Sequence, residues 1–139
     1  MLRRAHVQLF AVITLGWLLC FFPEPGVSGT RVAIVEYYFS VGCPACVKMA
    51  DYLKDFKMEG VEVVGYAVGA SEDAAKAYAK EKGLAFPVKP IPREDALFVL
   101  AYPTIVLKDP DRKKADFIEG IIEPDKLKAR IEAFVRASR

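Results

Sequence analysis

The two cysteines of Cys43-Pro44-Ala45-Cys46 constrain this chain more than any other feature. They lie where a continuous apolar run from Val32 to Phe39, typical of a strand buried on both faces, gives way to a helical pattern. Pro44 suits the first position of a helix, because an N–H group there would have no partner. The unpaired N–H groups of a helix start also favour the ionised form of a nearby thiol. The motif therefore predicts a close thiol pair, within reach of one disulfide, at the start of a helix.

The first 29 residues have the layout of a secretory signal. A basic start precedes an apolar run from Val7 to Phe22, and small residues follow at Val27-Ser28-Gly29. We expect cleavage after Gly29, which leaves a domain of residues 30–139. An uncleaved N-terminal membrane anchor is the alternative, although the apolar run falls just short of the roughly 17–25 residues that span a bilayer. Either way, the domain is expected outside the cytoplasm, periplasmic or secreted, where disulfides persist.

Residues 30–139 contain only Cys43 and Cys46, because Cys20 belongs to the leader. The loop that this pair closes is too short to stabilise the fold much, which favours switching over bracing. Structural zinc needs four ligands, and this domain has two cysteines and no histidine. A c-type haem needs a histidine after the second cysteine, where Val47 stands. These observations favour a redox-active pair over a permanent disulfide or a metal site.

The charge of the chain indicates no particular partner. The formal net charge is +2, and charges of both signs are interspersed apart from Arg112-Lys113-Lys114 in a predicted turn. That run is more typical of a solvated turn than of a nucleic-acid site, so we expect no nucleic-acid partner. About 110 residues after the leader suffice for one hydrophobic core, and we expect a monomer.

Strand and helix patterns alternate along the rest of the chain. Strands are predicted at residues 32–39, 61–68, 105–107 and 115–119. Helices are predicted from Pro44 to about Phe56, from Ser71 to Lys82, from about Arg93 to Leu100, and after Glu123. Residues 86–92 carry three prolines and are predicted to be extended without adding a strand to the order. The order β-α-β-α-α-β-β-α predicts an α/β fold with a mixed central sheet flanked by helices.

This order, with Cys-x-x-Cys at the first helix and Tyr102-Pro103-Thr104 before the third strand, resembles the thioredoxin superfamily. The resemblance covers residues 30–139, and the exported thiol–disulfide oxidoreductases of the TlpA-like branch are the most similar. It implies that Cys43 is the nucleophile and Cys46 the resolving thiol. It also implies that Pro103 is a cis-proline beside them, although a trans-proline that merely starts a strand is the alternative.

The resemblance further implies a substrate-binding surface around the cysteines. Tyr102 would present its backbone to an extended substrate segment, and Thr104 and Gly42 would border it. Gly120 matches the glycine that usually follows the last strand. Gly42 is a departure from the family pattern, since family members often have tryptophan at this position. A less bulky surface around the disulfide is therefore expected.

A second departure concerns the strand before the motif. Many relatives carry an acid or asparagine six residues before the first cysteine, where this chain has Tyr37. The acid, Glu36, stands one residue earlier, and a shift of one residue turns a side chain to the other face of a sheet. Glu36 is therefore a candidate proton acceptor for Cys46 or, alternatively, a solvent-facing residue at a strand end.

The sequence thus predicts an extracytoplasmic thiol–disulfide oxidoreductase that acts on cysteine-containing proteins. By resemblance, it would serve as a reductant that exchanges electrons with a membrane redox partner. No bound cofactor is needed, because the chemistry lies in the Cys43–Cys46 dithiol. The alternative is a thioredoxin-fold binding or chaperone module in which this disulfide is structural.

Overall fold

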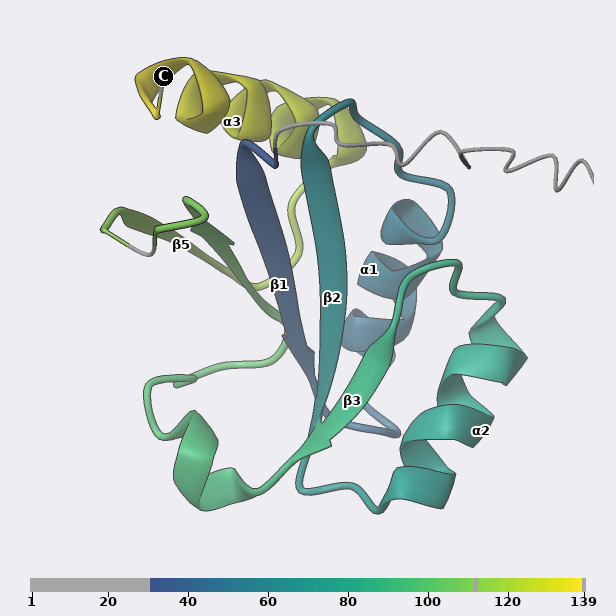
Figure 1. Cartoon of the computed structure of the whole chain (residues 1–139). Coiled ribbons are helices and arrows are strands. Elements are labelled where there is room, and N and C mark those ends of the chain that lie inside the picture. Colours follow the sequence, from purple (N-terminus) through teal and green to yellow (C-terminus); the bar gives the residue numbers. More distant parts are fainter. Residues whose placement is uncertain (1–30, 112, 139) are drawn as a thin grey trace, which may run out of the picture.

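The computed structural model describes residues 31–111 and 113–138 (Figure 1). The predicted leader, residues 1–29, lies outside the described residues. No helix in the described ranges is long and apolar enough to cross a bilayer. The elements follow in the order β1 (Ala33–Phe39), α1 (Pro44–Leu53), β2 (Val61–Val68), α2 (Glu72–Lys82), β3 (Val88–Ile91), the 3₁₀ turn η1 (Arg93–Ala96), β4 (Thr104–Lys108), β5 (Ala115–Glu119) and α3 (Pro124–Ala137).

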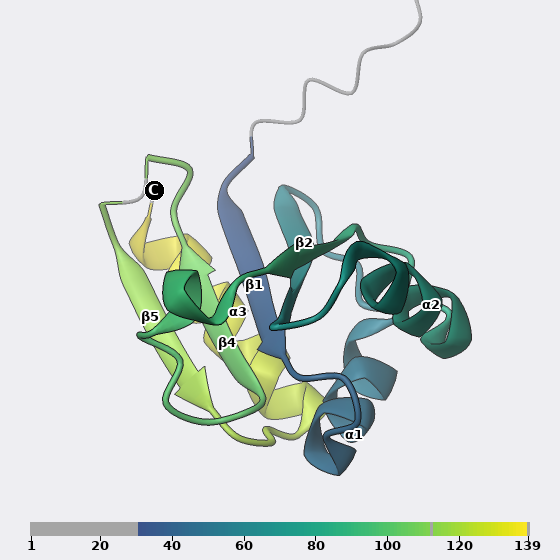
Figure 2. The same cartoon turned by 90° about the horizontal axis from the view of Figure 1, so that it is seen from below.

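The strands form one mixed sheet in the order β3-β2-β1-β4-β5. Strands β1, β2 and β3 are parallel, and β4 and β5 form an antiparallel hairpin beside β1. Because β1, β2 and β3 follow one another in one direction across the sheet, right-handed crossovers place α1 and α2 on the same face. Figure 2 shows the same arrangement from below. The predicted α/β architecture with a mixed sheet flanked by helices is confirmed.

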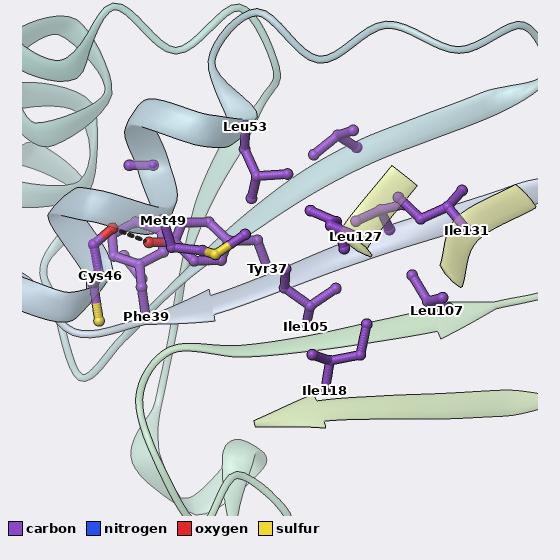
Figure 3. Packing of buried hydrophobic residues seen from close by; sticks show 14 of the residues in the cluster. Tyr37, Phe39, Cys46, Met49, Leu53, Ile105, Leu107, Ile118, Leu127 and Ile131 are labelled. Atoms are coloured by element: carbon purple, nitrogen blue, oxygen red, sulfur yellow. Dashed lines mark hydrogen bonds between the residues drawn. The ribbon is translucent and has the colours of Figure 1, made fainter. Parts of the chain in front are cut away.

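The side chains of β1 alternate between the two faces of the sheet. Tyr37 and Phe39 point to the side where α1, α2 and α3 all contribute to one buried cluster, which we call the helical face (Figure 3). Glu36 and Tyr38 belong to the other side, which we call the opposite face. No α-helix in the described part of the chain contributes to the buried cluster there, and residues 93–100 supply two of its apolar side chains. One strand therefore supplies two cores that differ in their cover.

The sheet contains one strand more than the predicted order. Residues 86–92 were expected to be extended, and four of them form β3, which pairs with β2. The N–H of Gly65 donates to the carbonyl oxygen of Pro87 at 2.8 Å, and that of Gly69 donates to Ile91 at the same distance. Pro90 is tolerated because β3 lies at the edge of the sheet, where one side of the strand needs no partner.

Two predicted helices are shorter in the structure. Helix α1 ends at Leu53 rather than near Phe56, yet Phe56 still packs against the core from the turn that follows. The helix predicted from Arg93 to Leu100 is only the turn η1, after which Val99 is buried and Leu100 exposed. In both cases apolar residues at helical spacing reach the core from a turn, which explains why the pattern overestimates the helix.

Candidate active site

The two cysteines are joined by a disulfide at the start of α1. Cys43 is the N-cap of the helix, and its Sγ accepts a hydrogen bond from the N–H of Cys46 at 3.2 Å. Pro44 occupies the first turn, as predicted. The Cys43 side chain is partly accessible, whereas the Cys46 side chain is fully buried in the cluster of the helical face. The two sulfurs therefore occupy different environments although only three positions separate them.

This asymmetry has a chemical consequence. When the disulfide is open, the Cys43 sulfur lies at the helix N-terminus, where N–H groups stabilise a thiolate. A thiolate in such a position is both more populated at neutral pH and accessible to another molecule. The Cys46 side chain is shielded from solvent, and its sulfur is bonded to that of Cys43. The geometry suits attack by Cys43 and a later, internal step by Cys46.

Pro103 lies at the same end of the sheet as the disulfide, where β1 ends and β4 begins. Thr104 pairs with Tyr38 near the carboxyl end of β1, only a few residues before Cys43. The Tyr102–Pro103 peptide bond is cis, as the resemblance implied. Pro103 itself is buried, and Tyr102 keeps 38% of its surface exposed. The loop before β4 therefore borders the disulfide with one buried and one accessible residue.

Hydrogen bonds fix this loop on both sides. The N–H of Gly120, which follows β5, donates to the carbonyl oxygen of Pro103 at 2.8 Å. Gly120 has a φ of 78°, a conformation that glycine adopts at little cost. The hydroxyl of buried Thr104 donates to the carbonyl oxygen of Ala101 at 2.7 Å. This hydrogen bond fixes the loop internally. It also uses the hydroxyl proton of Thr104, which is then not available to another acceptor.

Gly42 is exposed and directly precedes Cys43. A Cβ on this residue would meet no other heavy atom within 4 Å, so space alone does not require glycine here. The φ of 89° does favour it, because residues with side chains rarely adopt that conformation. Gly42 itself therefore adds no side chain to the surface beside Cys43.

Glu36 does not reach Cys46, and its predicted role as proton acceptor for that thiol is wrong. The carboxylate belongs to the opposite face, where Oε2 accepts the Tyr38 hydroxyl at 2.7 Å and pairs with Nζ of Lys108 at 2.5 Å. Helix α1 and Cys46 lie on the helical face. The alternative of a solvent-facing position is also wrong, since Glu36 is buried. The alternation of side chains along β1 separates the acid from the thiols.

Tyr37 is the polar side chain of β1 that does contact the motif (Figure 3). Its hydroxyl donates to the carbonyl oxygen of Cys46 at 2.6 Å. Tyr37 is fully buried, and this burial raises the pKa of its phenol far above the ordinary value; the nearby Tyr78 hydroxyl adds to the effect. The sequence predicted Tyr37 only as sheet core. Its placement two residues before buried Phe39 was the signal that it shares the helical face.

Several exposed large apolar side chains of the described residues lie next to the cysteine motif or to the loop that holds the cis-proline. Val41 precedes Gly42, Tyr102 precedes the cis-proline, and Ile121 follows Gly120. The others lie between β3 and β4 or on β5: Leu97, Phe98, Leu100 and Phe117. No cluster of three or more histidine, cysteine, aspartate or glutamate side chains suited to a metal occurs in residues 31–111 and 113–138. The accessible chemistry at this end of the sheet is that of a disulfide in apolar surroundings.

No protein-family model matches the sequence, and no curated protein matches it. Solved structures do match. A thiol:disulfide interchange protein of the thioredoxin family from Chlorobium tepidum is 21% identical, with a TM-score of 0.64 over 78% of this chain and 83% of that one. A thiol-disulfide isomerase from Corynebacterium glutamicum is 22% identical, with a TM-score of 0.63 over 78% and 84%.

A secreted Mycobacterium tuberculosis disulfide oxidoreductase, homologous to Escherichia coli DsbE, is 21% identical, with a TM-score of 0.57 over 76% of this chain and 84% of that one. The structural superpositions establish a shared architecture, and the low sequence identity leaves the activity to be argued from the site. The mixed sheet, the cysteine pair at the start of α1 and the cis-proline beside it agree with that architecture. This chain has the thioredoxin fold.

Proposed function

We propose that this protein is a thiol–disulfide oxidoreductase that exchanges disulfides with cysteine-containing proteins outside the cytoplasm. One observation carries the proposal: the disulfide joins an accessible sulfur at a helix N-cap to a fully buried one. A bracing disulfide needs no such asymmetry, and it would gain little stability from so short a loop. An exchange reaction uses both environments in turn.

In the proposed cycle the reduced protein acts as the reductant. The Cys43 thiolate attacks one sulfur of a substrate disulfide, forms a mixed disulfide and releases the other substrate sulfur as a thiolate. The Cys46 thiolate then attacks the Cys43 sulfur, closes the disulfide and releases the second substrate thiolate. The substrate gains two electrons and two protons, and a membrane redox partner restores the two electrons to the protein. No bound cofactor takes part in either step.

The exposed surface around the disulfide favours a polypeptide as the substrate. Val41, Tyr102 and Ile121 provide exposed apolar contacts around Cys43. The loop of Tyr102 also offers backbone groups with which an extended segment could pair in the manner of a short strand. Such contacts recognise a chain rather than a small thiol, whose surface is too small to cover them.

The location of the protein outside the cytoplasm is proposed from the predicted leader of residues 1–29. The structural similarity to a protein described as secreted is consistent with it. We propose that the domain acts as a monomer and that it follows the TlpA-like branch in its reductant role. The reductant role and the membrane partner derive from the resemblance, and the reduction potential described below tests the reductant role.

The test is a trap for the mixed disulfide. Cys46→Ser should hold a substrate protein on Cys43 as a covalent adduct that a reductant releases. Cys43→Ser is the matched control and should hold none, because the remaining Cys46 is buried. A Cys46→Ser protein that captures nothing from an extracytoplasmic extract would contradict the exchange reaction and favour a binding module with a structural disulfide.

The reduction potential of the pair then decides the direction of flow. A potential of about −270 mV would support a reductant, and a potential of about −120 mV would support an oxidant. The measurement uses equilibration with dithiothreitol or glutathione and separation of the two forms. A pair that never equilibrates would contradict both directions.

A further inference from the structure

The hydroxyl of Tyr37 makes a contact that the exchange cycle described above does not use. It reaches from β1 across the helical face to the carbonyl oxygen of Cys46, the residue that bears the resolving sulfur. Within an α-helix this oxygen already accepts from the N–H group four residues later. The Tyr37 bond is therefore an additional one, and it ties the first turn of α1 to the central strand of the sheet.

The ring of Tyr37 is held in place by its neighbours. It stacks on Phe39 with ring centroids 4.9 Å apart, and Phe39 in turn stacks on Tyr78 of α2 at 4.6 Å. All three residues are buried in the cluster that also contains Cys46 and Met49 of α1. A clamped aromatic ring loses little entropy when its hydroxyl forms a hydrogen bond, so the bond is well suited to fix the position of its acceptor.

The Tyr37 hydroxyl is also a constant donor. Burial raises the pKa of this phenol far above its ordinary value, so it keeps its proton throughout the range in which thiols titrate. It therefore cannot serve as a base for Cys46. What it can do is hold the backbone of Cys46 in the same place whether the disulfide is open or closed.

We infer that Tyr37 is a positioning residue for Cys46, which keeps the resolving sulfur directed at Cys43 while the mixed disulfide exists. The inference rests on the proposed exchange reaction. In the step concerned, a bond forms between the Cys46 and Cys43 sulfurs, and the bond from Cys43 to the substrate sulfur breaks. The electron pair leaves with the substrate thiolate, which takes its proton from water. A fixed Cys46 raises the rate of this internal step without affecting the first attack.

The inference is tested by separating the two chemical steps. The full chain, reduced, is mixed with dithiobis(nitrobenzoic acid), an aromatic disulfide that releases a coloured thiolate at each step. At high reagent concentration, attack by Cys43 outpaces resolution by Cys46, and two phases of release can be followed. In Tyr37→Phe the first phase should keep the wild-type rate, and the second should slow about 3- to 10-fold, as expected for one hydrogen bond. Equal second-phase rates in the two proteins would overturn the inference.

Tyr38→Phe is the matched control. Tyr38 is the adjacent buried tyrosine of the same strand, and its hydroxyl donates to Glu36 on the opposite face. The change removes the same atom from a hydrogen bond of similar length, so a general loosening of β1 would affect both variants. We expect both phases of Tyr38→Phe to match the wild type. A second phase slowed as much as in Tyr37→Phe would overturn the positioning role.

Two further outcomes complete the test. A wild-type protein that shows no second release would overturn the exchange reaction itself, and the inference with it. If Tyr37→Phe does not fold, 4-aminophenylalanine at position 37 takes its place, because it keeps a donor on the same ring. If the second release in that protein has the wild-type rate, the inference is supported. If the second release is slowed more than 10-fold, the inference is overturned.

Discussion

The two faces of the central sheet use buried polar groups in different ways. On the helical face, neutral Tyr37 contacts the backbone of Cys46. On the opposite face, Glu36 forms an ion pair with Lys108 and accepts the hydroxyl of Tyr38. Glu36 and Tyr37 are neighbours in one strand, yet only one of them can influence the disulfide. The alternation of side chains along β1, rather than closeness in sequence, therefore decides which polar groups contact the cysteine motif.

The faces also differ in how they are closed. Three helices cover the helical face, and the apolar side chains that they contribute to its cluster are buried or partly buried. The cluster on the opposite face is completed by residues 93–100, which leave Leu97 and Leu100 largely exposed. We therefore expect the free energy of unfolding to depend mainly on contacts of the helical face.

The largest effect is expected from a leucine of the helical face. Leu127 of α3 is 2% exposed, and Leu127→Ala should lower the free energy of unfolding by about 2–5 kcal/mol, because it removes buried surface and leaves a cavity. Leu97→Ala is the matched change at a side chain that is 76% exposed, and it should alter stability by less than about 0.5 kcal/mol. Urea unfolding of both variants measures the contrast. Equal losses would mean that the burial of Leu127 in the helical face adds nothing to stability beyond what an exposed leucine adds.

The ion pair of the opposite face should matter for stability and not for chemistry. Glu36→Gln leaves the Lys108 ammonium without its counter-charge; since the Lys108 side chain is 23% exposed, we expect a loss of about 2 kcal/mol, below that of a fully buried pair. Both phases of thiolate release should keep their wild-type rates. Adding Lys108→Met should recover part of the lost stability. If Glu36→Gln slows the resolving step, the separation of the two faces is contradicted.

Helix caps provide an intermediate effect on the helical face. The Ser71 hydroxyl accepts from the N–H of Ala74 at 3.2 Å and caps α2, so Ser71→Ala should lower stability by about 1 kcal/mol. Glu123 is the N-cap of α3 and makes no such side-chain bond. Glu123→Ala should therefore change stability by less than about 0.5 kcal/mol. Thermal unfolding compares the two, and a larger loss at Glu123 would contradict this ranking of the caps.

The smallest effect is expected for the pair that joins β5 to α3. Two hydrogen bonds of 2.7 Å from Arg130 lower the pKa of Asp116 below its ordinary value of 3.8. The pair is partly exposed, so Asp116→Asn should lower stability by only about 0.5 kcal/mol at neutral pH.

The pH dependence of this pair has a definite sign. Because the folded protein binds the Asp116 proton more weakly than the unfolded chain, the stabilisation is complete above the ordinary pKa and declines as pH falls through the folded one. The stability difference between wild type and Asp116→Asn should therefore vanish in acid. A difference that persists at the lowest accessible pH would show that packing, rather than charge, accounts for it.

Much of this architecture could be predicted because it follows from local patterns. Four strands, the helix after Ser71 with its end at Gly83, and the place of the cysteine pair agree with the sequence analysis. Strand β3 was not predicted, because it forms only by pairing with β2. Its Pro90 is compatible with a strand only at the edge of a sheet, and that edge position is not known from the sequence. The ends of α1 and η1 were also misjudged, since the apolar spacing continues into turns that pack on the core.

That two thiols meet at the start of a helix follows from the spacing of Cys43 and Cys46 and from the position of Pro44, which are local properties of the chain. Which side chains lie behind the two sulfurs depends on how the helices and strands pack together. The helices that pack on one face of the sheet bring Tyr37 to Cys46 and leave Glu36 with Lys108 on the other. That choice depends on contacts between residues far apart in the chain, and a change of one position along a strand reverses it.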